Sequence, residues 1–348
     1  MRILHILNSN SFSGAENVVC QMIQGLMNEY NLESAYCSPD GPIREAVAAR
    51  GVSYLPVSEL SCSEIHRVIE DYKPGIIHAH DMRASFIASL ACGKIPIISH
   101  IHNNALDSRR ISLKTLAYLL PAVKADHIYF VSDSSYKCFR FRGLFERKIS
   151  VLRNYINSDS VFEKMYEDES SYDFDVIFLG RLSPEKNPQR VMRIISMACQ
   201  KKKDLKVAIV GSGKLDEEIR LMASEYGIAD NIAFFGFVSN PMKILHDSKM
   251  MIFASLWEGI PMSALEAMTL GVPLVSTPTD GLCELITDGI TGYISDCDAV
   301  LAERIVEIAK DDQLRKTLSR NSREAILKLC NEKAALKIVY SQYMALCR

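Results

Sequence analysis

Short apolar runs alternate with longer amphipathic segments along most of this chain. The runs RILHIL, GIIHAH and PIISHIH lie in the first half, and FDVIFLG, KVAIVG and MMIFAS lie in the second. Such alternation predicts βαβ units, whose parallel strands are covered by helices on both faces. A polar and acidic stretch at residues 158–173 interrupts the pattern. We therefore predict an α/β protein with two doubly wound domains, residues 1–160 and 161–330, followed by a helix within residues 331–348.

Length and composition limit the classes of function. With 348 residues the chain can build two large cores, and its net charge of −2 argues against a nucleic-acid binder. The ten cysteines include no C-x-x-C pair, which indicates reduced thiols in a cytoplasmic protein. The amino terminus enters a strand directly, and no run of 18 uncharged apolar residues occurs. We therefore expect neither a signal peptide nor a transmembrane helix.

Residues 249–275 combine chemistry with a clear local structure. We predict a buried strand over residues 250–256 and a helix over 262–270, whose start and stop are marked by a proline and a glycine. Glu258 follows the strand, where open α/β sheets place their ligands, and Glu266 lies on the second helical turn. The first free amides of this helix suit a phosphate; they include those of Ser263, Ala264 and Leu265. A ligand whose phosphate binds the amides and whose hydroxyls bind the carboxylates would be a sugar nucleotide.

The segment EGIPMSALEAMTLGVP resembles the paired-glutamate motif of the retaining glycosyltransferases of family 4, also called group 1. The resemblance covers nearly the whole chain. It implies the GT-B fold, in which two Rossmann-like domains face an interdomain cleft. The amino-terminal domain would bind the acceptor, the carboxy-terminal domain would bind the nucleotide sugar, and the last helix would pack back on the first domain. In this reading Glu258 orients the donor sugar and Glu266 holds the ribose hydroxyls.

Other segments match the family in order and spacing. The loop GRLSPEKN contains Arg181 and Lys186, and two such cations can neutralise a departing diphosphate. Gly211 and Phe237 follow the next two strands and by resemblance line the nucleotide. The loop SGAE resembles the family's Gly-Gly-x-Glu loop with a serine for its first glycine, so only Gly14 is carried over as a diphosphate contact. The structural alternatives are a loop salt bridge for either cation and an ordinary helix start at Gly14.

Four of the eight histidines form two H-x-H pairs, at residues 78/80 and 100/102, each at the end of an apolar strand. Four imidazoles can bind zinc, but no cysteine or acid completes a closed shell, so we predict no metal site. Two D-x-D triplets, at residues 173–175 and 296–298, are interpreted as solvated turn residues. By resemblance His102 is the histidine that points at the donor sugar, and His80 is a candidate acceptor contact. We interpret His78 and His100 as buried structural residues.

Residues 109–153 are basic, with ten lysines or arginines and three acids. Within this region the spacing predicts a helix over residues 108–120 with one apolar side. That side carries Leu113, Leu116, Ala117 and Leu120. The helix is either a core element with a solvated charged face, or a surface for anionic lipid or for a lipid-diphosphate acceptor. In the second case Arg109 and Arg110 are acceptor contacts.

We thus predict a retaining, metal-independent glycosyltransferase that needs no cofactor and moves a sugar from a nucleotide diphosphate, expected to be UDP, to a hydroxyl. The expected acceptor is a lipid-linked saccharide of bacterial capsule or exopolysaccharide synthesis. The expected location is the cytoplasm, at the inner face of the plasma membrane. A non-catalytic nucleotide-sugar-binding subunit and a nucleotide-sugar 2-epimerase are the alternatives. A dehydrogenase is disfavoured because the first turn lacks G-x-G-x-x-G.

Overall fold

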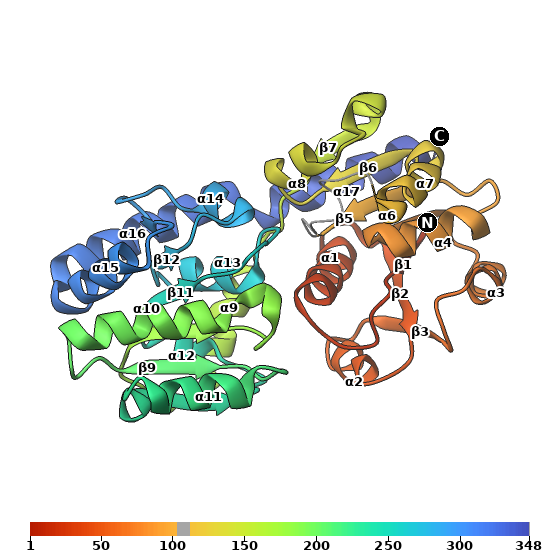
Figure 1. The fold of residues 1–348 in the computed structure, drawn as a ribbon. Coiled ribbons are helices and arrows are strands. Elements are labelled where there is room, and N and C mark those ends of the chain that lie inside the picture. Colours follow the sequence, from red (N-terminus) through yellow and green to blue (C-terminus); the bar gives the residue numbers. More distant parts are fainter. Residues whose placement is uncertain (103–111, 348) are drawn as a thin grey trace. The chain divides into compact units, whose positions relative to one another are not determined.

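The structure, a computed structural model, describes residues 1–102 and 112–347. The chain divides into two compact units (Figure 1). The first comprises Met1–Tyr155 and Glu332–Arg348, and the second comprises Ile156–Asn331. The acidic stretch that interrupts the sequence pattern contains helix α9 (Ser158–Tyr166), which belongs to the second unit. Among the described residues, no helix is both long enough and apolar enough to cross a bilayer.

The first unit is built on a parallel sheet with the strand order β3-β2-β1-β4-β5-β6-β7. Its apolar runs form strands because alternate side chains enter cores on opposite faces of the sheet. Ile3 and Ile76 pack into one core, and their neighbours Leu4 and Ile77 pack into the other. The strands are β1 (Arg2–Ile6), β2 (Glu33–Pro39), β3 (Ser53–Val57), β4 (Ile76–His80), β5 (Ile97–Ile101), β6 (His127–Phe130) and β7 (Ile149–Val151).

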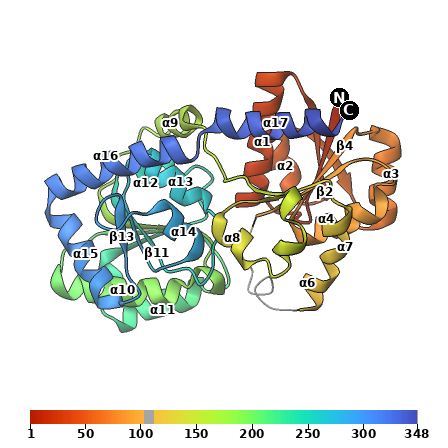
Figure 2. The same cartoon turned by 90° about the horizontal axis from the view of Figure 1, so that it is seen from above.

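Helices cover both faces of this sheet. They are α1 (Gly14–Tyr30), α2 (Ile43–Ala48), α3 (Cys62–Tyr72), α4 (Asp81–Ala91), α6 (Leu113–Ala117), α7 (Leu119–Lys124), α8 (Asp133–Cys138) and α17 (Glu332–Leu346). The last helix returns from the second unit and lies beside α1 (Figure 2). A side chain on Gly25 of α1 would meet Leu336 of α17 at 2.5 Å, so the glycine permits this close packing.

The second unit repeats the plan with a parallel sheet in the order β10-β9-β8-β11-β12-β13. The strands are β8 (Phe174–Leu179), β9 (Val207–Val210), β10 (Ile232–Gly236), β11 (Ser248–Phe253), β12 (Leu274–Ser276) and β13 (Gly292–Ile294). The helices besides α9 are α10 (Pro188–Lys201), α11 (Asp216–Glu225), α12 (Met242–His246), α13 (Met262–Thr269), α14 (Asp280–Leu285), α15 (Asp298–Lys310) and α16 (Asp312–Leu329). The predicted strand, loop and helix around Glu258 are confirmed as β11 and α13.

Both sheets share one topological feature. The strand order reverses between β1 and β4 in the first unit and between β8 and β11 in the second. In open α/β sheets the loops at the carboxyl ends of such neighbouring strands form the ligand site. The prediction of two doubly wound parallel-sheet domains is confirmed, and it directs attention to these two places.

The helix predicted over residues 108–120 differs from the structure. Residues 103–111 lie outside the described residues, and α6 and α7 meet at Tyr118. The buried positions of α6, α7 and their junction are Thr115, Tyr118, Pro121 and Ala122, whereas Leu113, Leu116, Ala117 and Leu120 are exposed. The reading as a core helix with these leucines inside is therefore wrong. The hydroxyl of Tyr118 hydrogen-bonds Ser99 at 2.6 Å, which explains why a polar aromatic side chain enters this core.

Candidate active site

Two loops at the carboxyl edge of the second sheet carry the predicted charged residues. Lys186 lies in the loop after β8, and Glu258 lies in the loop after β11. These strands are the neighbours between which the order reverses. The backbone also joins the loops, because the N–H of Leu256 donates to the carbonyl of Glu185 at 2.9 Å. The fold thus brings together two residues that are 72 positions apart in the sequence.

Lys186 and Glu258 form an ion pair that is only slightly open to solvent. Nζ of Lys186 donates to Oε1 of Glu258, and their side chains are 19% and 12% exposed. Oγ of Ser255 donates to the same carboxylate oxygen at 2.9 Å. An ammonium group has three N–H bonds, and one is used in this contact. Lys186 can therefore hold Glu258 in place and still donate to a ligand.

Arg181 does not join this pair. Its guanidinium is 3.4 Å from Glu185 in its own loop, and the side chain is 67% exposed. This contact is the loop salt bridge named as the alternative reading. An exposed pair of this kind contributes little to stability, so the arginine can turn to a ligand at small cost.

Glu266 lies on α13 and has no hydrogen bond or ion pair to any described residue. Its side chain is half-buried. Burial raises the pKa of its carboxyl group above the ordinary value, and the positive charge of Lys164 lowers it in part. A half-buried carboxylate without a protein donor is suited to accept hydrogen bonds from ligand hydroxyls.

Fewer amides at the start of α13 are free to bind a phosphate than the sequence suggests. Those of Ala264 and Leu265 donate to the carbonyl of Pro261, at 3.0 and 3.3 Å. Those of Met262 and Ser263 have no acceptor among the described residues. The phosphate seat expected at Ser263, Ala264 and Leu265 therefore reduces to the amides of Met262 and Ser263 in this state.

Gly211 and Phe237 lie at the carboxyl ends of β9 and β10. Gly211 has a φ of +135°, and a side chain there would lie 1.9 Å from the carbonyl oxygen of Gly180. Its N–H donates to the carbonyl of Gly236 at 2.7 Å. The close approach of these two loops therefore requires a glycine at position 211, independently of any contact with a ligand. Phe237 is 78% exposed, so its aromatic face is available at this edge.

The sequence analysis missed residues that support Glu258. Ser255 binds its carboxylate, and Thr279 Oγ1 donates to the Ser255 carbonyl at 2.8 Å. Gly281 of α14 lets this helix approach the Glu258 loop, because a side chain there would lie 1.2 Å from the carbonyl oxygen of Gly259. Small polar residues and glycines are common in loops, and their partners are distant in sequence, so no local signal identifies them.

In the first unit, Gly14 is exposed as the first residue of α1, and the loop before it follows β1. Two residues later, the buried Glu16 accepts a hydrogen bond from Oγ of Ser13. At the end of β4, Asp81 has a φ of +67° and accepts a hydrogen bond from the N–H of His102 at 3.0 Å. Burial raises the pKa of Asp81 to about 6. Non-glycine residues with positive φ often occur at functional sites, and neither Glu16 nor Asp81 was predicted.

His80 and His102 both lie at this edge, next to the turn after β1. His80 Nδ1 is 2.8 Å from His102 Nε2, and both side chains are buried. The buried positions of His78 and His100 agree with their interpretation as structural residues. The predicted acceptor contacts Arg109 and Arg110 lie outside the described residues.

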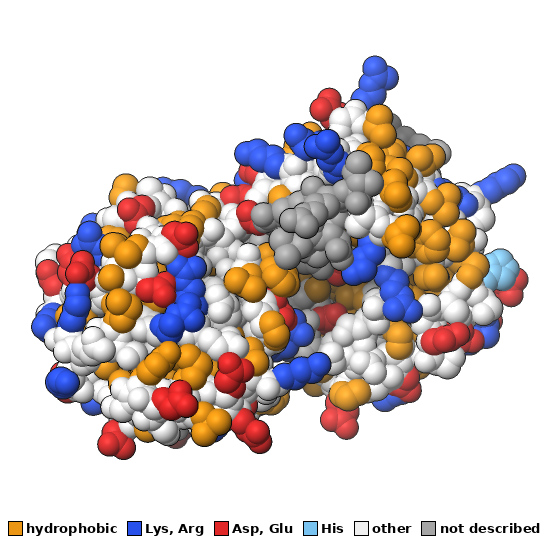
Figure 3. All heavy atoms as spheres, viewed as in Figure 1, with side chains coloured by type: hydrophobic (Ala, Val, Ile, Leu, Met, Phe, Trp, Pro, Cys, Tyr) orange, Lys and Arg blue, Asp and Glu red, His pale blue; other side chains and the backbone are white. Residues whose placement is uncertain are grey.

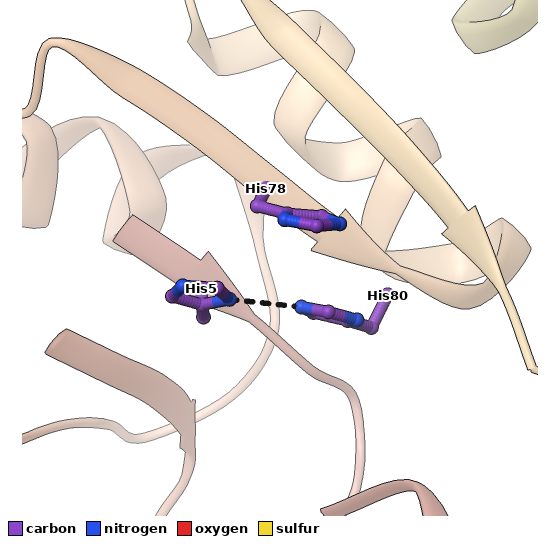
Figure 4. A group of neighbouring side chains, drawn as sticks. All are labelled: His5, His78 and His80. Atoms are coloured by element: carbon purple, nitrogen blue, oxygen red, sulfur yellow. Dashed lines mark hydrogen bonds between the residues drawn. The ribbon is translucent and has the colours of Figure 1, made fainter. Parts of the chain in front are cut away.

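Five buried histidines of this sheet form what we call the histidine cluster: His5, His78, His80, His100 and His102. Within the described residues, two trios have candidate ligand atoms within 4.8 Å of one another. The trio His5, His78 and His80 has ring planes within 29° of parallel (Figure 4). His5 and His80 lie edge to edge, with His5 Nδ1 3.1 Å from His80 Nε2, and the ring of His78 stacks over them (Figure 4). Imidazole binds a metal through a lone pair in the ring plane, so the lone pairs of His78 do not converge with those of the other two rings on one ion.

The second trio contains the close pair His80 and His102. Its 2.8 Å separation is shorter than the about 3.3 Å between two nitrogens on a tetrahedral zinc with bonds of about 2.0–2.1 Å. Neither trio therefore fits a metal well as it stands. The absence of a metal from the reaction remains a prediction.

The D-x-D triplets require a correction. Asp175 is buried in β8, where it pairs with Lys249 at 2.9 Å and Lys202 at 3.2 Å. Asp298 begins α15 and pairs with Arg190 at 2.7 Å. Asp175 and Asp298 are fixed by ion pairs within the second unit, so the interpretation as solvated turn residues is wrong for these two, whereas Asp173 and Asp296 are exposed.

Two family models match this chain. Residues 12–160 match Glycosyltransferase Family 4, and residues 163–325 match Glycosyl transferases group 1. Together the matches cover both units.

The sequence identity to individual relatives is low. An uncharacterized glycosyltransferase of Methanocaldococcus jannaschii is 27% identical over 247 residues, which is 63% of this chain and 61% of that protein. The Escherichia coli UDP-Gal:alpha-D-GlcNAc-diphosphoundecaprenol alpha-1,3-galactosyltransferase is 23% identical over 362 residues, 94% of this chain and 92% of that protein. Among solved structures, Anabaena HepE in complex with UDP-glucose has a TM-score of 0.86 and 17% identity, covering 99% of this chain and 100% of that one. The likeness to solved structures establishes the GT-B fold.

Proposed function

Because this chain belongs to glycosyltransferase family 4 (group 1), we propose that it is a retaining transferase that moves a sugar from a UDP-sugar to a hydroxyl of a lipid-linked saccharide. The observation that carries the proposal is the Lys186–Glu258 pair at the reversal point of the second sheet. There a cation, a fixed carboxylate and the free amides of Met262 and Ser263 belong to neighbouring loops and one helix start.

The donor assignment has two supports. The half-buried Glu266 carboxylate has no hydrogen-bond donor among the described residues, and two ribose hydroxyls would supply hydrogen bonds to it. Among similar proteins, Anabaena HepE has been crystallised with UDP and with UDP-glucose, and the Escherichia coli transferase is a UDP-Gal galactosyltransferase. The same relative acts on a sugar linked to diphosphoundecaprenol, which supports a lipid-linked acceptor in surface polysaccharide synthesis.

The chemistry would proceed as follows. Lys186 and Arg181 stabilise the negative charge that develops on the diphosphate as the bond from sugar C1 to the phosphate oxygen breaks. The acceptor oxygen forms the new bond to C1 from the same face, and its proton passes to the departing phosphate oxygen. Glu258, held by Ser255 and Lys186, accepts a hydrogen bond from a donor-sugar hydroxyl and orients C1. Two cations and helix amides then supply the charge that a metal supplies elsewhere. The prediction that His102 contacts the donor sugar comes from the family resemblance.

The test is a transfer assay with UDP-, GDP- and ADP-sugars and undecaprenyl-diphosphate-linked acceptors. Lys186→Ala and Glu258→Ala should each abolish transfer while leaving the melting temperature within a few degrees of wild type. Lys206→Ala is a matched control, because it breaks an exposed ion pair with Asp173 in the same unit. Full transfer by either site variant would overturn the assignment.

The same assay separates the two alternatives. A non-catalytic binding subunit would bind the nucleotide sugar without ever releasing nucleotide in the presence of any acceptor. A 2-epimerase would convert the sugar without an acceptor. Either result would replace the transferase proposal.

We further propose that α6 and α7 contact an anionic membrane. The apolar patch Leu113, Leu116, Leu120 and Val123 is exposed, with Leu113 at 87% and Val123 at 67%. Figure 3 shows hydrophobic side chains gathered over this side of the first unit. The patch lies within the basic residues 109–153. Exposed leucines beside lysines and arginines are typical of a surface that enters the headgroup region of anionic lipids.

Sedimentation with vesicles tests this contact. The protein should bind phosphatidylglycerol vesicles more than phosphatidylcholine vesicles, and salt should weaken binding. The double change Leu113→Ser and Leu116→Ser should weaken it about tenfold or more, since a buried leucine contributes about 1.5–3 kcal/mol. Leu221→Ser is the control, because Leu221 is 65% exposed on α11 of the second unit. Equal binding by the double variant would rule out the patch.

A further inference from the structure

Three histidines of the first unit form a hydrogen-bonded chain. His5 Nδ1 lies 3.1 Å from His80 Nε2, and His80 Nδ1 lies 2.8 Å from His102 Nε2. The dashed line in Figure 4 marks the first of these links. His5 lies inside β1, His80 ends β4, and His102 follows β5. The chain therefore runs across three neighbouring strands, from the interior of the sheet to its carboxyl edge.

The three imidazoles are neutral at pH 7. Burial lowers the pKa of His5 to about 3 and that of His102 to about 4, and it lowers the pKa of His80 well below the ordinary value. Among the described residues, the other titratable groups that face the chain are His78 and His100 of the histidine cluster, Asp81, whose carboxylate accepts the backbone N–H of His102, and Glu16, whose negative charge acts on His102. Each neutral ring carries one N–H.

The positions of these three protons are linked. In each hydrogen bond one nitrogen donates and the other accepts, and every ring has a single proton to give. The rings must therefore share one tautomer. If all carry the proton on Nδ1, the free N–H is at His102 Nδ1. If all carry it on Nε2, the free N–H is at His5 Nε2.

The two ends of the chain differ. His5 Nε2 is buried inside the sheet and has no partner among the described residues. An orphaned N–H is rarer in protein interiors than an orphaned acceptor. His102 Nδ1 is also buried and lacks a described partner, but His102 follows β5 at the carboxyl edge of the sheet and is 8% exposed, whereas His5 is fully buried inside β1. The carboxylate of Glu16 acts on His102, whereas no charged group is recorded acting on His5. Both differences favour the proton at the His102 end.

We propose that His5 and His80 are positioning residues that hold His102 in its Nδ1–H tautomer, so that His102 presents a hydrogen-bond donor to an oxygen of the bound ligand. The identity of that ligand, a nucleotide sugar, rests on the proposed function, whereas the tautomer does not. The chain does not serve as a proton relay, because its far end at His5 Nε2 meets no acceptor or donor among the described residues.

Nitrogen NMR of the full-length protein with ¹⁵N-labelled histidine tests the tautomer directly. His5, His80 and His102 should each show a protonated Nδ1 and a bare Nε2. Couplings across both N–H···N bonds should join the three rings in the predicted order. His127, which bonds Ser150 at 2.8 Å and takes no part in the chain, is the internal control. A bare Nδ1 at His102, missing couplings, or displacement of all three resonances by added Zn²⁺ would overturn the proposal.

Two variants of His5 separate positioning from packing. His5→Asn can place an amide N–H where Nδ1 lies and should keep His102 in the Nδ1–H tautomer. His5→Phe fills the space without a donor and should give a mixture of tautomers at His102. Transfer activity should fall about two- to tenfold in His5→Phe, the range expected for one weakened neutral hydrogen bond, and return in His5→Asn. Unchanged His102 tautomers in His5→Phe would contradict the role of His5.

The two proposals fail separately. If the predicted couplings are present but no nucleotide sugar is turned over, the proposed function is wrong and the tautomer assignment stands. If transfer occurs and His102 is protonated on Nε2, the transferase stands and the positioning role is lost.

Discussion

Glu266 shows how a functional carboxylate can work against stability. It is half-buried on α13 without a hydrogen bond or ion pair to the described residues, and burial raises the pKa of its carboxyl group. A carboxyl group whose pKa is raised by folding is relatively favourable at low pH, and that contribution is lost as the pH rises through the folded-state pKa. Whenever this carboxyl group is ionised in the folded protein, it is less well solvated than in the unfolded chain.

This conflict gives a prediction for Glu266→Gln. The variant should melt at a higher temperature than wild type at pH 8, and the difference should shrink as the pH falls below the pKa of Glu266. It should bind UDP about tenfold more weakly or worse, since hydrogen bonds to a charged group contribute about 1.5–3 kcal/mol. Calorimetric melting and titration with UDP measure both effects. A variant that binds UDP as wild type does would remove Glu266 from the ribose site.

At the residue scale, the charged residues of the site could be predicted from the sequence better than the residues that hold them in place. Lys186 and Glu258 were predicted because their residue types and their places after strands are informative on their own. Ser255, Asp81 and the partners of the histidines were missed because their roles arise from contacts between strands distant in the sequence. The ion pair between Lys186 and Glu258 is of the same kind, since only the sheet order makes the two loops neighbours.

At the scale of elements, close approach of backbones decides the shape of the site. Gly281 at the start of α14 faces the carbonyl of Gly259, and Gly213 faces the carbonyl of Leu182, where a side chain would lie 2.3 Å away. The Glu258 loop and the Lys186 loop are thus each packed against a glycine from another element. Side chains at these positions would push the loops away from the sheet.

Gly281→Ala tests this packing. The added carbon would lie 1.2 Å from the carbonyl oxygen of Gly259, so α14 must shift. We expect a loss of about 3 kcal/mol or more of folding free energy, as for severe overpacking, together with loss of transfer. Gly180→Ala is the matched control in the same unit, because its nearest neighbour would be Phe178 at 3.8 Å, an ordinary contact. Denaturant unfolding measures both variants, and equal stability would contradict the assigned contact.

The helix predicted over residues 108–120 shows the limit of periodicity. Leucines at helical spacing indicate an apolar face, but they do not say whether protein or lipid covers it. In the structure Thr115 and Tyr118 are buried instead, held partly by the hydrogen bond of Tyr118 to Ser99. Exposure of the leucines removes the core interpretation. A surface for anionic lipid or for a lipid-diphosphate acceptor stays a prediction.

At the scale of the whole molecule, the last helix belongs to the first unit although it follows the second in the sequence. Leu336, Val339 and Tyr343 of α17 are buried in the first unit, and the hydroxyl of Tyr343 is 2.6 Å from His78 Nδ1. The first core is therefore incomplete until the entire chain has been made.

Leu336→Ala should consequently destabilise the first unit selectively. Removal of a buried leucine costs about 2–5 kcal/mol. Hydrogen exchange of amides in β1 and α1 should become faster, while exchange in β8 and β11 should stay as in wild type. Leu327→Ala, a change of an exposed leucine on α16, is the control. Faster exchange confined to the second unit would contradict this division of the chain.

The order of strands and helices could be predicted from the sequence because each βαβ unit has a local pattern of its own. The places at which the strand order reverses could not be predicted in this way, because strand order is a property of the assembled sheet. The family resemblance predicts that the charged residues converge on one diphosphate, and the structure shows how the loops of Lys186 and Glu258 become neighbours, because β8 and β11 are adjacent in the sheet.

The central claim is that the loops after β8 and β11 and the start of α13 bind the diphosphate of a nucleotide sugar. A crystal structure with UDP tests it most directly. The account predicts phosphate oxygens within hydrogen-bond distance of Lys186 Nζ and of the Met262 and Ser263 amides, with the ribose hydroxyls on Glu266. UDP bound elsewhere, with Lys186 contacting Glu258 alone, would contradict it.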